Sequence, residues 1–398
     1  MSGWSGIHDD MLLLVVGRLP ALDLLRFRAV CASWRAAAAI FVDGRGRPRP
    51  DRPWLLLPAD APDPDDGCRF VVSRDREVPV VALPARLGRD GGRGFVPLGS
   101  SRGVIVAADD RGEMHLLDPV TGKRRALPPV ISLPLVDGVE GGPAGLNVRH
   151  GGGTVSRIDG LIHKAVPVPA PDGGLLVVVI YRQVHHRNQW ATARPGDRAW
   201  KSVKPTSIPA VVDVAVHRGQ LYANTRYGMV YAFPELRGLG SASPEIIPSV
   251  TRRPNAYVER SFLVESPPGS AGGRRGLMQV ELLRPVAASG GGEDEEEGFV
   301  VRVLDECGET WEEADDIGDV AVLVDASGAV AASTRECPGL RPSTVYFAVD
   351  LAGETRVCAY SLAAAGKGKH KRIEVIESIP MAEGYKPPCF WFAPVYTP

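Results

Sequence analysis

Residues Ile7 to Arg35 read IHDDMLLLVVGRLPALDLLRFRAVCASWR and are the most informative segment of the chain. It contains three short helical patterns, and the first, from Met11 to Val16, is apolar on every face rather than along one stripe. Three short helices cannot bury that much apolar surface among themselves. The sequence therefore predicts a small helical module with apolar surface that meets a partner.

The spacing of the side chains predicts how these helices are oriented. Asp9 and Asp10 are expected to supply the N-cap oxygens of the first helix and to suit the positive end of its dipole. Spacing of i, i+3, i+4 and i+7 predicts one buried stripe on this helix, formed by Leu12, Val15, Val16 and Leu19. In the second helix, Leu24 and Phe27 are expected to project away from the face shared by Leu22, Leu25 and Ala29.

This run resembles an F-box, which combines an acidic cap and an apolar first helix with Leu-Leu, Val-Cys and Trp positions. The resemblance extends without a gap from Ile7 to Trp34. It implies docking on the Skp adaptor of a cullin-RING ubiquitin ligase, with nine residues in or behind the interface: Ile7, His8, Leu12, Val15, Leu24, Leu25, Val30, Cys31 and Trp34. The sequence departs from the family at His8, where proline is usual, so a preset backbone angle and an apolar contact are expected to be lost.

Trp34 and the Leu24-Leu25 pair are the expected anchors of the adaptor interface, because buried aromatic and aliphatic residues commonly dominate such interfaces. Changing Leu24 and Leu25 together to alanine is predicted to abolish adaptor binding while the remaining domain stays folded. A second interpretation needs no adaptor. In it, the same helices form an N-terminal hairpin that packs on the protein's own larger domain.

Length, charge and cysteine use exclude several classes of protein. The chain has 398 residues and a formal net charge of -1, so no overall electrostatic field attracts nucleic acid or a membrane. Its six cysteines form no C-x-x-C pair, which favours a reducing compartment over a zinc ribbon or a disulfide framework. The Met11 to Val16 run is too short to span a membrane. We expect a soluble, intracellular protein of the cytoplasm, the nucleus or both.

The composition changes after the helices. Residues 43–53 are rich in Arg, Pro and Gly and predict a solvated linker, and beyond them short β-rich runs replace the helical periodicity. The 45 glycines and 35 prolines exceed the average usage of these residues, as many tight turns require. The predicted division is an F-box domain over 1–42, the linker over 43–53, and a β domain over 54–398 with a disordered acidic insertion at 289–298.

A weak internal repeat predicts how the β domain is built. In one unit a strand containing Trp200 precedes the apolar strand 211–216 and a Gly turn, and in the other Trp311 precedes the strand 320–324 and a Gly turn. Stacked four-stranded blades give this order, so a β-propeller of six or seven blades is predicted. The same strands also fit paired β-sandwiches, which stay open as the alternative. The fold class is therefore mainly β with a small N-terminal α module.

The β domain also resembles a plant family in which an F-box is joined to a domain of unknown function numbered 295. The motifs that carry the likeness are structural rather than chemical: Gly99 to Gly103, His115 to Gly122, Asp213 to Phe233, Ile317 to Ala321, Arg341 to Phe347 and Pro387 to Phe392. The resemblance extends over nearly the whole chain.

Motifs with possible chemistry favour structural interpretations. Gly99 to Gly103 satisfies G-x-S-x-G, but a β-run follows where a nucleophile elbow needs a helix, so we expect a blade-to-blade turn. His185-His186 has no convergent zinc ligands and predicts a polar loop. The glycine runs 141–145 and 151–153 lack the lysine of a phosphate loop and predict a long flexible connection. No catalytic residue, cofactor or metal is expected.

These features predict a non-catalytic substrate receptor of a Skp-cullin-F-box ubiquitin ligase. The helices would dock on the Skp-type adaptor and through it on a cullin, while the propeller loops bind an unknown target protein and raise its effective concentration near the charged enzyme. Two other functions stay open. One is an adaptor-free binding scaffold with a decayed F-box, and the other is a propeller hydrolase with carboxylates or a His-paired Ser at its axial mouth.

Overall fold

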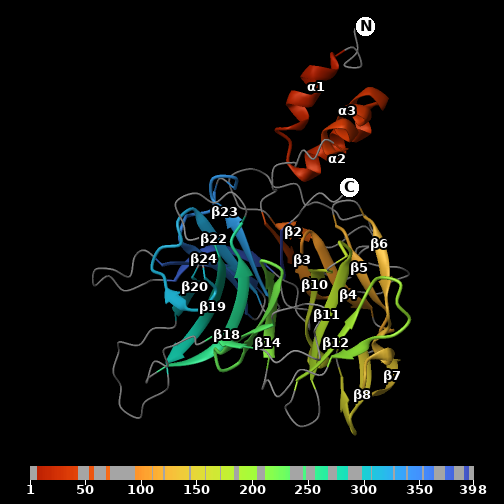
Figure 1. The fold of residues 1–398 in the computed structure, drawn as a ribbon, viewed down its shortest axis with the longest axis vertical. Coiled ribbons are helices and arrows are strands. Elements are labelled where there is room, and N and C mark those ends of the chain that lie inside the picture. Colours follow the sequence, from red (N-terminus) through yellow and green to blue (C-terminus); the bar gives the residue numbers. More distant parts are fainter. Residues whose placement is uncertain are drawn as a thin grey trace.

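Figure 1 shows three N-terminal helices at one end of a larger body of strands. This computed structural model describes residues 7–43, 53–57, 69–71, 95–109, 111–119, 122–142, 145–156, 158–170, 172–182, 188–203, 211–233, 245–247, 256–267, 276–285, 298–305, 307–325, 328–337, 339–351, 354–362, 373–380 and 390–393. The predicted linker, the acidic insertion and the His185-His186 pair therefore lie wholly or almost wholly outside the described residues.

The helical module consists of α1 (Asp9–Val16), α2 (Ala21–Val30) and α3 (Ala32–Asp43). Pro20 is the N-cap of α2, and Cys31 adopts an extended backbone that separates α2 from α3. Helix α3 packs against both other helices. The small core that they share contains Leu12, Val16, Leu24, Phe27, Ala37 and Ala38. The same continuous apolar cluster includes Phe390 and Phe392 of the propeller.

Four of the sheets are antiparallel meanders, in which strands follow one another in chain order from the inner edge outward. The first two contain β3 (Phe95–Ser101), β4 (Val104–Asp109), β5 (Met114–Leu117) and β6 (Arg124–Leu127), then β10 (Ile162–Pro169), β11 (Leu175–Arg182), β12 (Asn188–Ala193) and β13 (Lys201–Val203). The next two contain β14 (Val211–His217), β15 (Gln220–Thr225), β16 (Val230–Phe233) and β17 (Glu245–Ile247), then β18 (Ala256–Glu265), β19 (Leu277–Pro285), β20 (Gly298–Leu304) and β21 (Trp311–Glu313).

The fifth sheet departs from this order. It contains β22 (Val320–Val324), β23 (Ala329–Ser333), β24 (Thr344–Leu351), β25 (Glu354–Ser361) and β26 (Glu374–Pro380). Its spatial order is β23-β22-β24-β25-β26, and β22 pairs with β24 in parallel. The inner strand of this blade is therefore the second strand of its first hairpin.

The sixth sheet joins the two ends of the β domain. It contains β1 (Trp54–Leu57), β2 (Arg69–Val71) and β27 (Phe390–Phe392), and β1 lies between the other two. The inner strands β3, β10, β14, β18, β23 and β27 contact one another in that order, and β27 returns to contact β3. The described sheets thus close into a six-bladed ring, as the propeller prediction required, rather than into paired sandwiches.

A β-bulge recurs in the inner strand of each of the first four blades. The register shifts between Pro97 and Gly99, Ile162 and Lys164, Val211 and Asp213, and Val258 and Arg260. A bulge turns the following side chain to a new direction and increases local twist. Equivalent positions after the bulge are thereby occupied by Lys164 and Asp213 in neighbouring blades, and these two side chains form an ion pair at the propeller axis.

The two tryptophans of the predicted repeat have equivalent positions. Trp200 comes directly before β13 and Trp311 begins β21, the outermost strands of the second and fourth blades. The indole N–H of Trp200 donates to the Pro128 carbonyl oxygen beyond the first blade at 2.9 Å. Trp311 packs in a cluster with Tyr222 of the third blade. Each tryptophan therefore packs its blade against the preceding one.

The predicted flexible connection around residues 141–153 is wrong. This segment forms a separate three-stranded sheet of β7 (Val136–Gly142), β8 (Gly145–His150) and β9 (Gly153–Val155), flanked by the short helices η2 (Val130–Ser132) and α4 (Ile158–Leu161). Val148 and Val155 contribute to the apolar cluster between the first two blades, and this packing holds the glycine-rich strands in place. Figure 1 places β7 and β8 at the end of the molecule opposite the helices.

Candidate functional site

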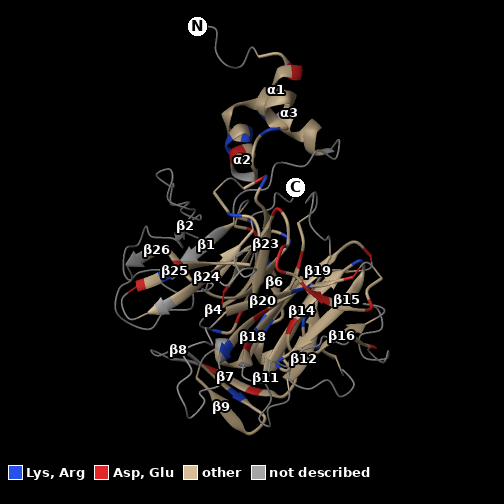
Figure 2. Cartoon of the chain, turned by 90° about the vertical axis from the view of Figure 1, so that its left-hand side faces the viewer, with Lys and Arg blue, Asp and Glu red and all other residues tan. Residues whose placement is uncertain are grey.

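Helix α1 has one buried and one exposed apolar face. Leu12 and Val16 are buried against α3, whereas Met11, Leu14 and Val15 are 57%, 62% and 44% exposed. Their i, i+3, i+4 spacing places these three on one stripe. The excess apolar surface predicted from the sequence is therefore present, and we call Met11, Leu14 and Val15 the α1 stripe. In Figure 2 the start of α1 carries the colour of acidic residues, and the rest of the helix contains no charged residue.

Two exposed apolar residues lie on the other helices. Val30 at the end of α2 and Ile40 in α3 are both more than half exposed. Phe27 of α2 and Trp34 of α3 stack with their ring centroids 4.3 Å apart, so the Trp34 side chain joins the two helices as well as reaching solvent. The helical module is thus held together by a small core and still presents apolar side chains on all three helices.

His8 replaces the predicted caps. It is the N-cap of α1, and its Nδ1 accepts a hydrogen bond from the Asp10 amide at 3.5 Å. Asp9 and Asp10 lie inside the first turn, where they suit the helix dipole but do not cap the helix, so the prediction of Asp caps is wrong. The φ of His8 is -61°, which is the angle that a proline ring imposes. His8 therefore adopts the backbone angle that a proline at this position would impose.

The nine predicted interface residues fall into three groups. Those exposed to solvent are His8, Val15 and Val30. Those partly buried are Ile7, Leu25, Cys31 and Trp34. Those fully buried in the helical core are Leu12 and Leu24. Leu12 and Leu24 lie beneath the surface of the helical module and cannot contact a partner directly. Leu24 is therefore not a surface anchor.

Two expectations about the helix faces are also wrong. Val15 is exposed, although the predicted stripe placed it in the core, because α1 is only eight residues long and meets α3 along Leu12 and Val16. Leu24 and Phe27 were expected to project away from the main face of α2, yet they are its buried residues, while Ala29 is exposed. The core side of α2 is decided by where α3 packs, which spacing alone does not reveal.

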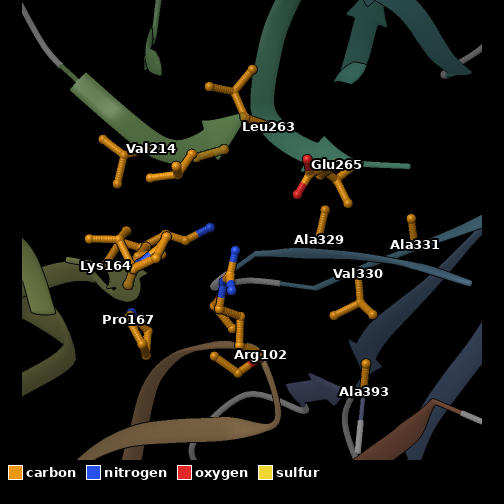
Figure 3. A pocket seen from close by; sticks show the side chains of 18 of the residues that line it. Arg102, Lys164, Pro167, Val214, Leu263, Glu265, Ala329, Val330, Ala331 and Ala393 are labelled. Carbon is orange, nitrogen blue, oxygen red and sulfur yellow. The ribbon is translucent and has the colours of Figure 1, made fainter. Parts of the chain in front are cut away.

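A second candidate site lies on the propeller axis. A cavity of about 230 Å³ is lined by inner strands and their ends from all six blades, including the β3–β4 turn and Ala393 after β27. Its polar lining residues are Ser100, Ser101, Arg102, Lys164 and Glu265. Figure 3 shows the Arg102 and Lys164 side chains pointing into this space. Trp54 of β1, the first described strand after the helices, pairs with Phe392, the neighbour of the lining residue Ala393.

The charged groups around the axial cavity are mostly paired. Lys164 Nζ lies 2.5 Å from Asp213 Oδ1, and Asp213 also accepts hydrogen bonds from the Val214 and Leu263 amides at 2.7 and 2.9 Å. Burial raises the pKa of the Asp213 carboxyl, and the Lys164 ammonium opposes that rise. Glu265 Oε1 lies 3.0 Å from His217 Nδ1. Arg102 is the cavity's remaining charged side chain.

Sequence reasoning missed this group. Lys164, Asp213 and Glu265 come from three blades, and only ring closure brings them together. The one available signal was the repeated inner-strand pattern, in which Lys164 and Asp213 follow equivalent bulges. Ser101 of the G-x-S-x-G motif lies at the end of β3, and the strand β4 follows. The motif is a turn, as predicted, but it connects two strands within one blade rather than two blades.

The described residues contain neither a candidate metal centre nor a candidate membrane-spanning helix. No group of three or more His, Cys, Asp or Glu side chains in the described part of the chain could hold a metal ion. None of the described helices has both the length and the apolar character needed to cross a membrane.

A three-helix F-box joined to a β-propeller defines an F-box protein of the substrate-receptor type. A family model described as the KIB1-4 beta-propeller matches residues 71–361, and an F-box domain model matches residues 4–42. The chain therefore belongs to the KIB1-4 beta-propeller family and carries an F-box domain. F-box domains generally bind Skp1-type adaptors, and F-box proteins are generally non-catalytic subunits of ubiquitin ligases.

The chain is similar to At1g65770 of Arabidopsis thaliana, which is named as an F-box protein. The two are 27% identical over 240 residues, which span 58% of this chain and 59% of that relative. Among solved structures, TolB from Acinetobacter baumannii matches 90% of this chain and 71% of its own at 12% identity, with a TM-score of 0.42. The gluconolactonase XC5397 from Xanthomonas campestris matches 86% of this chain and 97% of its own at 10% identity, with a TM-score of 0.34.

Proposed function

We propose that this protein is a substrate-recognition subunit of a Skp-cullin-F-box ubiquitin ligase. The F-box would dock on a Skp-type adaptor, and the propeller loops would bind a target protein whose lysines are then presented to the ubiquitin-charged enzyme. In this function the chain supplies binding and orientation, while the ligase core supplies the chemistry. The finer family assignment, to plant F-box proteins with a domain of unknown function numbered 295, and a location in the cytoplasm or nucleus belong to the same proposal.

The observation that carries the proposal is the α1 stripe. Met11, Leu14 and Val15 are exposed although the F-box has its own core, and none of them belongs to the apolar cluster that includes Phe390 and Phe392 of the propeller. Large apolar side chains grouped on an exposed helix face are typical of protein interfaces. The alternative in which this hairpin only packs on its own domain would bury this stripe, and it is not buried.

Two substitutions of opposite charge test the adaptor interface. Met11→Asp places a negative charge in the first turn of α1, and Leu14→Lys places a positive charge in its last turns, so both suit the helix dipole. Each is expected to weaken binding to a purified Skp-type adaptor by about tenfold or more, as loss of a central apolar contact does. The measurement is titration calorimetry on the full chain, with circular dichroism to confirm that the helices remain.

The matched control is Ile246→Lys. Ile246 lies in β17 on the propeller and is 57% exposed, close to the exposure of Met11 and Leu14. It is expected to leave adaptor binding unchanged. If wild-type protein shows no binding to the adaptor, or if all three variants lose binding equally, the receptor function fails.

The two rival functions predict other results. An adaptor-free scaffold would not co-purify a cullin, whereas the receptor would do so through the adaptor. A propeller hydrolase would need several carboxylates or a His-paired Ser at the axial mouth. The axial cavity presents one carboxylate, Glu265, which is paired with His217, and Ser101 has no histidine beside it among the described lining residues. The cavity is nevertheless not purely apolar or amide-lined, and its charged side chains need another explanation.

A further inference from the structure

The axial cavity brings three charged side chains around one space. Figure 3 shows the Lys164 and Arg102 side chains pointing toward each other, while the Glu265 carboxylate faces the cavity from the other side. Apolar side chains such as Val166, Val214 and Leu263 form much of the remaining wall. Charges between low-dielectric walls focus the electric field and attract a counter-ion more strongly than charges in open solvent.

Lys164 is held in place by its surroundings. The bulge in β10 directs it to the axis, and its ammonium contacts the Asp213 carboxylate of the next blade. Both side chains are buried, so their pairing fixes the Nζ atom in one position. A Cβ atom at Gly328 would lie 3.0 Å from Nζ, which places the ammonium close to the fifth blade as well. A glycine at 328 leaves this space for the lysine.

Arg102 reaches the same cavity from a strained turn. Its φ is 53° and that of Gly103 is 76°, so both central residues of the β3–β4 hairpin have left-handed backbones. Asn or Gly is the usual choice at the first of these positions, and arginine there costs conformational energy. No hydrogen bond or ion pair of the Arg102 guanidinium is found within the described part of the chain. This turn directs a positive charge into the cavity, and the described residues provide no ion-pair partner for it.

The charge balance favours an anion beside these two groups. The negative charge of Asp213 balances the positive charge of Lys164, and on the opposite side of the cavity His217 contacts Glu265. Arg102 is left as the surplus positive group, with the Lys164 ammonium beside it. Guanidinium and ammonium groups bind carboxylate and phosphate oxygens with charge-assisted hydrogen bonds. The Ser100 and Ser101 positions in the same lining can add hydroxyl donors.

We propose that the axial cavity binds the carboxylate or phosphate group of a small molecule, held by Arg102 and Lys164. The volume of about 230 Å³ is below the roughly 300–1,000 Å³ typical of drug-sized ligands, so the ligand is small. Its remaining atoms would contact the apolar wall, and Glu265 would accept a hydrogen bond from a hydroxyl or amine of the ligand. This site goes beyond the receptor function and does not depend on adaptor docking.

Calorimetric titration of the full chain tests the site with two defined probes, inorganic phosphate and succinate, at an ionic strength held constant with sodium chloride. Saturable binding of at least one probe with one site per chain is expected. Arg102→Asn should weaken this binding by at least about tenfold, because one charge-assisted contact is lost. Binding of phosphate alone or of succinate alone identifies which anionic group the site takes.

The matched control is Arg218→Asn. Arg218 occupies the same position in the β14–β15 turn, with a φ of 50° followed by Gly219 at 83°, but it is not part of the axial lining. This variant should change binding by less than about twofold, because Arg218 does not line the cavity and salt screens a charge that does not contact the probe. Modification by phenylglyoxal gives a second readout, in which the bound probe protects Arg102 and not Arg218. The proposal is overturned if neither probe binds, or if both variants lose binding equally.

Discussion

Trp54 of β1 pairs with Phe392 of β27, so the first strand of the propeller is hydrogen-bonded to the last. The sixth blade is built from both ends of the β domain, and the ring closes only when the C-terminal strand is in place. Asp325 strengthens this closure from the fifth blade, because its Oδ2 accepts a hydrogen bond from the Trp391 amide at 2.5 Å. The ends of the chain are thereby coupled to the stability of the whole ring.

We expect Phe392→Ala to destabilise the propeller strongly. Phe392 is fully buried at the junction of the last blade, the first blade and the cluster that includes F-box residues. Removing a buried phenylalanine side chain costs about 3–5 kcal/mol. Guanidinium unfolding followed by tryptophan fluorescence measures this loss. Val375→Ala on β26, where the side chain is half exposed, is the control, and equal effects of the two substitutions would contradict a role for Phe392 in closure.

Much of this architecture could be predicted from the sequence. The all-round apolar run at Met11–Val16 indicated an exposed helix face, and the strands around Trp200 and Trp311 indicated blades, because both patterns are local. The orientation of α2 was not predictable, since the packing of α3 decides that Leu24 and Phe27 are inside. The axial ion pair was not predictable either, because Lys164 and Asp213 meet only when successive blades stack.

Leu24→Ala is expected to unfold the F-box rather than only to weaken docking. Leu24 is 0% exposed, and replacing a buried leucine by alanine costs about 2–5 kcal/mol, which is much of what so small a core can supply. Leu25 is partly buried, so Leu25→Ala should cost less. Hydrogen exchange of the α2 amides distinguishes the two variants. Full protection of α2 in Leu24→Ala would show that this side chain is not needed for the helical core.

Arg102→Asn and Arg218→Asn should each stabilise the folded protein. Both arginines have a left-handed backbone in two-residue hairpin turns, where asparagine followed by glycine is favoured. Relief of this strain is worth about 1 kcal/mol. Thermal unfolding in a buffer without phosphate or carboxylate measures the gain. A loss of stability in Arg102→Asn but not in Arg218→Asn would mean that Arg102 supports the fold rather than a ligand.

His150 should make stability depend on pH below about 7, the upper end of the range in which an ordinary histidine titrates. Burial lowers the pKa of this imidazole, and Asp137 opposes the change only in part. Just below the ordinary histidine pKa of about 6.5, the unfolded chain therefore binds a proton that the folded chain excludes. Stability consequently rises as the pH increases toward this value and then levels off above it. His115 shifts in the same direction and adds to the slope.

The substitution His150→Phe isolates this contribution. The ring of His150 meets Tyr181 edge to face with centroids 5.7 Å apart, and phenylalanine can keep that contact. Unfolding free energies of the wild type and the variant are measured at several pH values, and the variant should gain stability relative to the wild type as the pH falls from about 7, because it lacks the titrating imidazole. A constant difference between the two curves would show that His150 does not titrate in this way.

A buried polar network joins the third and fourth blades, and it includes the ion pair of Arg302 and Glu281. Arg302 and Glu281 contact each other while both are almost completely buried, and Gln279 donates to Asn224 Oδ1 at 3.2 Å across the blade boundary. Removing one member of such a pair leaves the other charge buried without a partner, which costs about 3–5 kcal/mol. Arg302→Met should therefore destabilise the propeller by that amount in chemical unfolding.

The double substitution Arg302→Met with Glu281→Leu should recover most of this loss, because two apolar side chains of similar volume can replace a buried pair at little cost. A double variant as unstable as Arg302→Met alone would show that Glu281 contributes through the Ser261 hydroxyl, which donates to Glu281 Oε1 at 3.5 Å, rather than through the arginine. Recovery in the double variant would show that the ion pair, which joins β19 and β20 within the fourth blade, adds little net stability and that the loss in Arg302→Met comes from the unpaired Glu281 charge.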